Sequence, residues 1–120
     1  MFEVKETFTT KTQEVIAQAI RLEVKKTRLH PYDINCGQCT ELAEKVLDRL
    51  AKQGIVVEYT ETENMDVPNV KHDYPGHAWL VWKPKKTTLH FDAEEPEGIR
   101  DWKDLPIFHR YRANIGRKIA

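Results

Sequence analysis

Two stretches of the chain carry hydrophobic residues at helical spacing. In the first, from Thr10 to about Arg28, apolar residues recur every three or four positions and charged residues fill the positions between them. The second runs from Asn35 to Leu50, with apolar residues 3, 4, 7, 8 and 11 positions after Cys39. This spacing predicts two amphipathic helices. Gly54 is placed to end the second helix.

The rest of the chain is richer in β-branched and aromatic residues, with turn-forming residues between the apolar runs. Its patterns predict, in chain order, a strand at 55–60, a long polar loop at 61–75, strands at 77–82 and 87–92, a short helix or turn at 99–105 and a last strand at 107–111. The basic turn at 83–86 predicts that the second and third strands form a hairpin. The predicted fold class is α+β: the second helix packs on a small antiparallel sheet, and the first helix adds a layer.

Length and charge narrow the function classes. A chain of 120 residues is expected to form a single domain, 1–120. Its formal net charge is zero, which predicts no general attraction to nucleic acid or to an anionic membrane. The first six residues have no apolar core of a signal peptide. We therefore expect the protein to act in the cytoplasm, either of the cell that makes it or of a cell into which it is delivered.

Both cysteines of the chain, Cys36 and Cys39, stand at the predicted start of the second helix. A helix start presents unpaired backbone N–H groups and the positive end of the helix dipole, and both stabilise a thiolate. A neighbouring histidine lowers a thiol pKa further. The sequence therefore predicts an activated cysteine nucleophile here.

A histidine and an aspartate complete the candidate site. If the hairpin turns at 83–86 and residue 82 faces residue 87, then His77 lies opposite Asp92. Cross-strand neighbours are about 5 Å apart at Cβ, close enough for a hydrogen bond between the two side chains. Asp92 would orient His77, and His77 would take the thiol proton. His72 and His90 are rival histidines; His30 and His109 are expected to be structural.

This order of residues resembles that of papain-like and transglutaminase-like thiol enzymes. Gly37-Gln38-Cys39 resembles their nucleophile helix, and Gly76-His77-Ala78-Trp79 resembles their histidine strand. The closest likeness is to the small papain-fold toxin domains of bacterial polymorphic toxins, which show a Cys-x-x-Cys helix, a Gly-His strand, then Phe-Asp, Pro-x-Gly and Trp. The matching residues are Cys36, Cys39, Gly76, His77, Phe91, Asp92, Pro96, Gly98 and Trp102.

The likeness covers residues 33–105, and residues 1–30 lie outside it as an added N-terminal helix. It implies a papain-like (transglutaminase-like) fold and a cysteine-dependent acyl-transfer enzyme: a protease, a glutamine deamidase or a transglutaminase-like enzyme. The likeness to toxin domains adds a toxin or effector role to these expectations. Such an enzyme takes a protein or peptide substrate through its amide and needs no cofactor. Where papain has its oxyanion-donating glutamine, this chain has Asp33.

The sequence leaves the nucleophile open. The helical register and Gly54 favour Cys39, whereas Asn35-Cys36 resembles the Asn-Cys start of some permuted papain-like enzymes. We place Cys39 first and Cys36 as the alternative. Two other function classes also stay open: a non-catalytic module that binds a partner protein on the same fold, and a zinc or redox module built on Cys-x-x-Cys.

Overall fold

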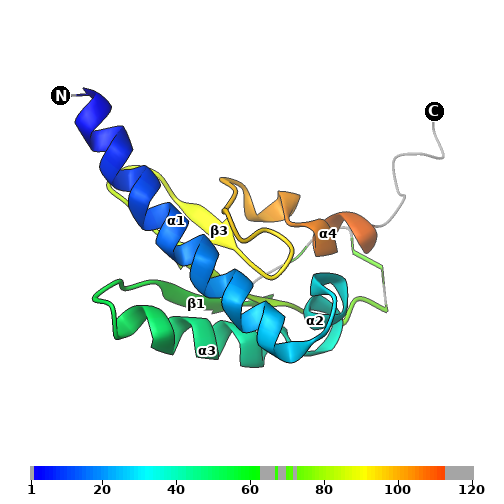
Figure 1. The fold of residues 1–120 in the computed structure, drawn as a ribbon. Coiled ribbons are helices and arrows are strands. Elements are labelled where there is room, and N and C mark those ends of the chain that lie inside the picture. The colour runs from blue at the N-terminus through cyan, green and yellow to red at the C-terminus, as the bar shows by residue number, and fades with distance from the viewer. Residues whose placement is uncertain (1, 63–66, 68–69, 72, 113–120) are drawn as a thin grey trace, which may run out of the picture.

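The computed structural model describes residues 2–62, 67, 70–71 and 73–112, and within them the fold is α+β, as the sequence predicts (Figure 1). The sheet is antiparallel, with strand order β1-β2-β3. In chain order the elements are α1 (Phe2–Thr27), α2 (Pro31–Gly37), α3 (Cys39–Ala51), β1 (Glu58–Glu61), β2 (Ala78–Trp82), β3 (Leu89–Phe91), the 3-10 helix η2 (Trp102–Asp104) and α4 (Pro106–Arg110).

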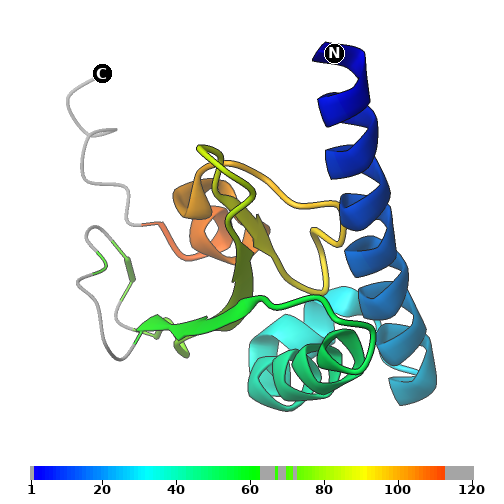
Figure 2. The ribbon, with the colours of Figure 1, turned by 90° about the vertical axis from the view of Figure 1, so that its left-hand side faces the viewer.

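Helices cover both faces of the sheet (Figure 2). On one face α1 and α3 pack against each other and bury their predicted apolar positions against Leu80 and Phe91. On the other face Trp79 and Val81 pack with η2, α4 and the residues before them. The side chains of β2 therefore alternate between two separate apolar clusters, as expected for a central strand that is covered on both sides.

The apolar stripes of the two long helices match the sequence prediction, but the helix boundaries differ from it. Helix α1 begins at Phe2, so Thr10 lies inside the helix and does not cap it. The second predicted helix is two helices, because the backbone leaves helical geometry at Gln38 (φ −126°). Helix α1 ends at Thr27, and Pro31 occupies the first turn of α2, where its missing N–H costs no hydrogen bond.

One strand prediction is wrong in part, and another is wrong. Residues 55–57 precede β1, which starts at Glu58. The last predicted strand, 107–111, is instead the short helix α4, which begins at Pro106 and buries Ile107 and Phe108. A short apolar run after a proline fits a helix start as well as a strand, and burial of its residues beneath Trp79 decides between them.

The hairpin of β2 and β3 is also shifted from the predicted register. Trp82 pairs with Leu89 and Leu80 pairs with Phe91, so the connection is two residues longer than the predicted turn. Extended outward, this register places His77 opposite residue 94, with Asp92 as a diagonal neighbour. A shift of two residues keeps both side chains on the same face of the sheet.

The described part of the chain holds no helix whose length and apolarity would let it cross a membrane.

Candidate active site

Cys39 is the first residue of α3. Helix α2 ends at Gly37 and α3 begins two residues later, so the chain presents a fresh helix start at the thiol. Among the described residues, the side chain of Gln38 makes no hydrogen bond that would cap this start. The first N–H groups of α3 therefore stay available to a thiolate or to a developing oxyanion. The Cys39 side chain is partly exposed.

His77 is held by a threonine from the end of β1. The Thr62 N–H donates to the His77 carbonyl at 3.0 Å, and the His77 N–H donates to the Thr62 hydroxyl at 3.0 Å. The hydroxyl of Tyr74 donates to the same Thr62 oxygen at 3.3 Å. Gly76, with φ of +86°, supplies the left-handed turn that brings the chain into this position. The backbone of His77 is thus fixed independently of its side-chain contacts.

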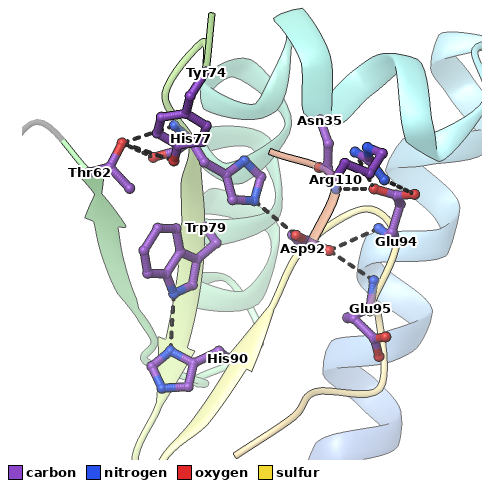
Figure 3. A network of polar contacts seen from close by, with 10 residues as sticks. All are labelled: Asn35, Thr62, Tyr74, His77, Trp79, His90, Asp92, Glu94, Glu95 and Arg110. Atoms are coloured by element: carbon purple, nitrogen blue, oxygen red, sulfur yellow. Dashed lines mark hydrogen bonds and ion pairs between the residues drawn. The ribbon is translucent and has the colours of Figure 1, made fainter. Parts of the chain in front are cut away.

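The His77 and Asp92 side chains meet in the interior (Figure 3). His77 Nε2 and Asp92 Oδ2 are 2.8 Å apart, and the two side chains are 0% and 2% exposed. The other carboxylate oxygen of Asp92 accepts the N–H groups of Glu94 and Glu95 at 3.0 and 2.9 Å. An ionised carboxylate only accepts, so the proton of a neutral His77 resides on Nε2. This leaves Nδ1 unprotonated and free to act as a base.

The Cys39 thiol lies beside this imidazole, and each group shifts the pKa of the other. Burial acts to raise the pKa of Cys39, but the interaction with His77 and the N–H groups of Ala78 and Thr40 lower it overall. Burial acts to lower the pKa of His77, but Asp92 and the thiol raise it overall. Both shifts favour a thiolate beside an imidazolium. Within the described residues, Nδ1 of His77 has no hydrogen-bond partner, so this nitrogen is the one available to the Cys39 thiol.

Neighbouring aromatic rings fix the imidazole in place. Trp79 stacks on His77 with ring centroids 5.6 Å apart, and Phe108 meets it edge-on at 5.9 Å. The indole N–H of Trp79 donates to His90 Nδ1 at 3.0 Å. The rival His90 therefore serves Trp79, and burial lowers its pKa.

The other histidines lie away from the thiol or outside the description. His30 caps α2, where its Nδ1 accepts the Tyr32 N–H at 3.1 Å. His109 lies 3.5 Å from the carboxylate of Asp104. His72 falls outside the described residues. Of the described histidines, His77 is the one placed against Cys39.

A surface pocket opens over the thiol. Its volume is about 590 Å³, counting the solvent at its mouth, and its lining includes Cys39, His77, Glu61 and Pro75. Cys36 also lines this pocket, but it belongs to α2 and lies beside Arg110 and Tyr111. The structure therefore brings Cys39, His77 and Asp92 together and leaves Cys36 at the rim.

Sequence reasoning missed four polar residues around the site: Asn35, Thr62, Glu94 and Arg110. The acidic residues 94, 95 and 97 suggest a solvated loop, yet the Glu94 side chain is only 16% exposed and pairs with Arg110. Asn35 is buried and donates to Glu94 at 2.9 Å. A single signal pointed toward this group: Asn35 directly precedes Cys36.

Among the described residues, no three or more His, Cys, Asp or Glu side chains are grouped as metal ligands would be. No protein-family model, curated protein or solved structure gives a significant match to this chain. The interpretation of the site therefore depends on its own geometry.

Proposed function

We propose that this protein is a cysteine-dependent acyl-transfer enzyme that acts on an amide, with Cys39 as nucleophile, His77 as base and Asp92 as the group that orients the base. The observation that carries the proposal is the buried contact of 2.8 Å between His77 Nε2 and Asp92, with the partly exposed Cys39 thiol beside the same imidazole, whose Nδ1 stays free. We further propose that the domain is a papain-like (transglutaminase-like) fold, because the nucleophile starts a helix packed on an antiparallel sheet that carries the base.

The chemistry follows from these positions. The Cys39 thiolate attacks the carbonyl carbon of the amide, and the negative charge moves to the carbonyl oxygen, where N–H groups at the start of α3 stabilise it. The His77 imidazolium then donates its proton to the amide nitrogen, and the C–N bond breaks. The amine or ammonia departs, and the acyl group stays bound to Cys39 as a thioester. His77 next takes a proton from water, or from an amine, as that molecule attacks the thioester and releases the thiol.

The limited size of the pocket favours a projecting substrate group, because about 590 Å³, counting the solvent at its mouth, leaves little room for several peptide residues. A pocket lined by residues of α2, α3 and the β1–β2 connection takes one side chain more readily than a long extended peptide. The primary amide of a glutamine side chain on a partner protein is the substrate class that we put first. With water as acceptor, the product is glutamate plus ammonia, a mass gain of about one unit, as the thioester scheme requires.

The test begins with the thiol. In a Cys36→Ser background, where labelling reports Cys39 alone, iodoacetamide should alkylate the protein fast at mildly acidic pH. An unperturbed thiol, with a pKa of about 8.5, would be almost unreactive there. His77→Ala should slow this labelling at least tenfold, since it removes the cation that stabilises the thiolate; each tenfold corresponds to about 1.4 kcal/mol.

His109→Ala is the matched control, because His109 is a half-exposed histidine that lies 3.5 Å from the Asp104 carboxylate and takes no part in the support of His77. Incubation of the active protein with candidate target proteins, followed by mass spectrometry, then separates deamidation, transamidation and cleavage. If Cys39 is labelled slowly and His77→Ala does not change the rate, the enzyme proposal is rejected. The binding-module alternative is then favoured, because a binding module needs no activated thiol.

A further inference from the structure

The carboxylate of Glu94 joins segments that come from three parts of the chain. Its Oε2 accepts from Arg110 Nη1 at 3.0 Å, and its Oε1 lies 2.9 Å from Arg110 Nη2. The same Oε1 accepts from Asn35 Nδ2 at 2.9 Å. The three side chains point toward one another in Figure 3, from the end of α4, the loop after β3 and the middle of α2. We refer to Asn35, Glu94 and Arg110 as the Glu94 bridge.

The Glu94 bridge is attached directly to both halves of the candidate site. On one side, the backbone N–H of Glu94 donates to the Asp92 carboxylate, so Glu94 fixes the oxygen that is not bonded to His77. On the other side, Asn35 lies four residues before Cys39, and the Gln38 N–H donates back to the Ile34 carbonyl at 2.7 Å. A shift of Asn35 would therefore move the start of α3.

Burial makes the bridge selective about its partners. Asn35 is 1% exposed, and the side chains of Glu94 and Arg110 are 16% and 24% exposed. The Arg110 guanidinium also lies 4.2 Å above the Tyr32 ring, on the same short helix as Asn35. A charged group that is largely removed from water needs a charged partner. Because Arg110 and Asn35 both bond Glu94, they hold α4 and α2 against the turn at residues 92–95, which we call the Asp92 turn.

We propose that Glu94 is a positioning residue of the Cys39 site: through Asn35 and Arg110 it sets the distance between the nucleophile helix and the Asp92 turn. The inference rests on the proposed function, because it assigns Glu94 an effect on the thiolate–imidazolium pair. It also extends the functional unit beyond residues 33–105, since Arg110 lies in α4.

The experiment measures the alkylation rate of Cys39 against pH for Glu94→Ala in the Cys36→Ser background. With the bridge removed, α2 and α4 no longer hold the nucleophile helix at its distance from the Asp92 turn, so the onset of fast labelling should move to higher pH. At mildly acidic pH the labelling rate should fall about tenfold, which corresponds to weakening the thiolate–imidazolium pair by about 1.4 kcal/mol. Melting temperature is recorded for every variant, because a loss of stability alone would not move the pH profile.

Glu97→Ala is the matched control. Glu97 belongs to the same loop and pairs with Arg21, but the two side chains are 73% and 53% exposed and the pair ties the loop to α1. It should leave the profile unchanged. Glu94→Gln keeps an oxygen for Asn35 while losing the charge that Arg110 requires. If Glu94→Ala does not fold, Glu94→Gln should move the onset of labelling in the same direction by a smaller amount.

Two results would overturn the inference. A Glu94→Ala or Glu94→Gln protein that melts at lower temperature but keeps the parental pH profile would make the bridge purely structural. An equal shift of the labelling onset in Glu97→Ala would show a general effect of loop charge. Failure of the proposed function looks different, because the parent protein itself would then lack fast labelling at acidic pH.

Discussion

Replacing Asp92 with asparagine tests the candidate site most directly, because the structure predicts which way the new side chain points. Oδ1 of Asp92 accepts two backbone N–H groups, from Glu94 and Glu95, and that position requires an oxygen. In Asp92→Asn the amide NH₂ must therefore occupy the other position, facing His77 Nε2. The NH₂ group donates, so Nε2 becomes an acceptor and the imidazole proton moves to Nδ1. In the proposed mechanism, Nδ1 is the nitrogen that receives the thiol proton.

The substitution also removes a buried charge beside the imidazolium. For unit charges about 4 Å apart at an effective dielectric constant of about 20, the lost attraction is about 4 kcal/mol. At about 1.4 kcal/mol per tenfold, this limits the fall in the imidazolium population to about a thousandfold. We expect the alkylation rate of Cys39 at mildly acidic pH to fall by between tenfold and a thousandfold. The fold should be retained, since both backbone hydrogen bonds to residue 92 survive.

The assay is the pH dependence of iodoacetamide labelling in the Cys36→Ser background, with the thiolate absorbance followed in parallel. Glu95→Gln is the control, because Glu95 is a neighbouring carboxylate whose pKa is raised by burial and by Asp92 and whose side chain is not bonded to His77. If Asp92→Asn labels within twofold of the parent rate across the acidic range, then neither the charge nor the tautomer argument holds, and His77 does not act through Asp92.

Two further predictions concern stability. Gly98 has φ of +87°, and an added Cβ would lie 2.6 Å from the Phe91 ring. Gly98→Ala should therefore lower the free energy of unfolding by about 3 kcal/mol through backbone strain and overpacking. Gly37→Ala is the control, because it has open space around it and should change the free energy of unfolding little. For Glu23, burial acts to raise the pKa, but the hydrogen bond from Arg49 lowers it overall. Its stabilising effect is therefore present above the ordinary carboxyl pKa and lost as pH falls through the folded value. Glu23→Gln should cost about 2 kcal/mol in urea unfolding at neutral pH, and less than half of that near pH 3; an unchanged difference would contradict the assignment.

The long helices were predictable because their burial follows the chain's own periodicity. Ile16, Ala19 and Ile20 are buried in α1, and the apolar positions of α3 pack on them. The break at Gln38 was not predictable in this way. Ile34 and Asn35 are buried, so the pattern reads smoothly across the junction, while only the backbone changes direction. That break decides which cysteine starts a helix, and the sequence alone left this open between Cys36 and Cys39.

The contact between His77 and Asp92 was found from a register that is wrong by two residues. The turn was placed at the basic residues 83–86, but strand pairing stops at Trp82 and Leu89. An error of one residue would have sent Asp92 to the other face of the sheet, beyond the reach of His77. An error of two keeps the face and converts a direct neighbour into a diagonal one, still within reach of two extended side chains. The prediction therefore depended on the alternation of side chains along the strands, which puts His77 and Asp92 on the same face of the sheet, and not on the position of the turn.

The polar support of the site lay beyond sequence reasoning because it depends on distance through space. Glu94 and Glu97 are three residues apart in one acidic loop, and each pairs with an arginine. Their patterns in the sequence are equivalent, yet one side chain is 16% exposed and the other 73%. The difference arises because Arg110 of α4 and Asn35 of α2 both meet the Glu94 carboxylate, an arrangement that no local periodicity encodes. If the Glu94 bridge sets the geometry of Cys39 and Asp92, Glu94→Ala should slow the labelling of Cys39 at mildly acidic pH, and Glu97→Ala should leave it unchanged.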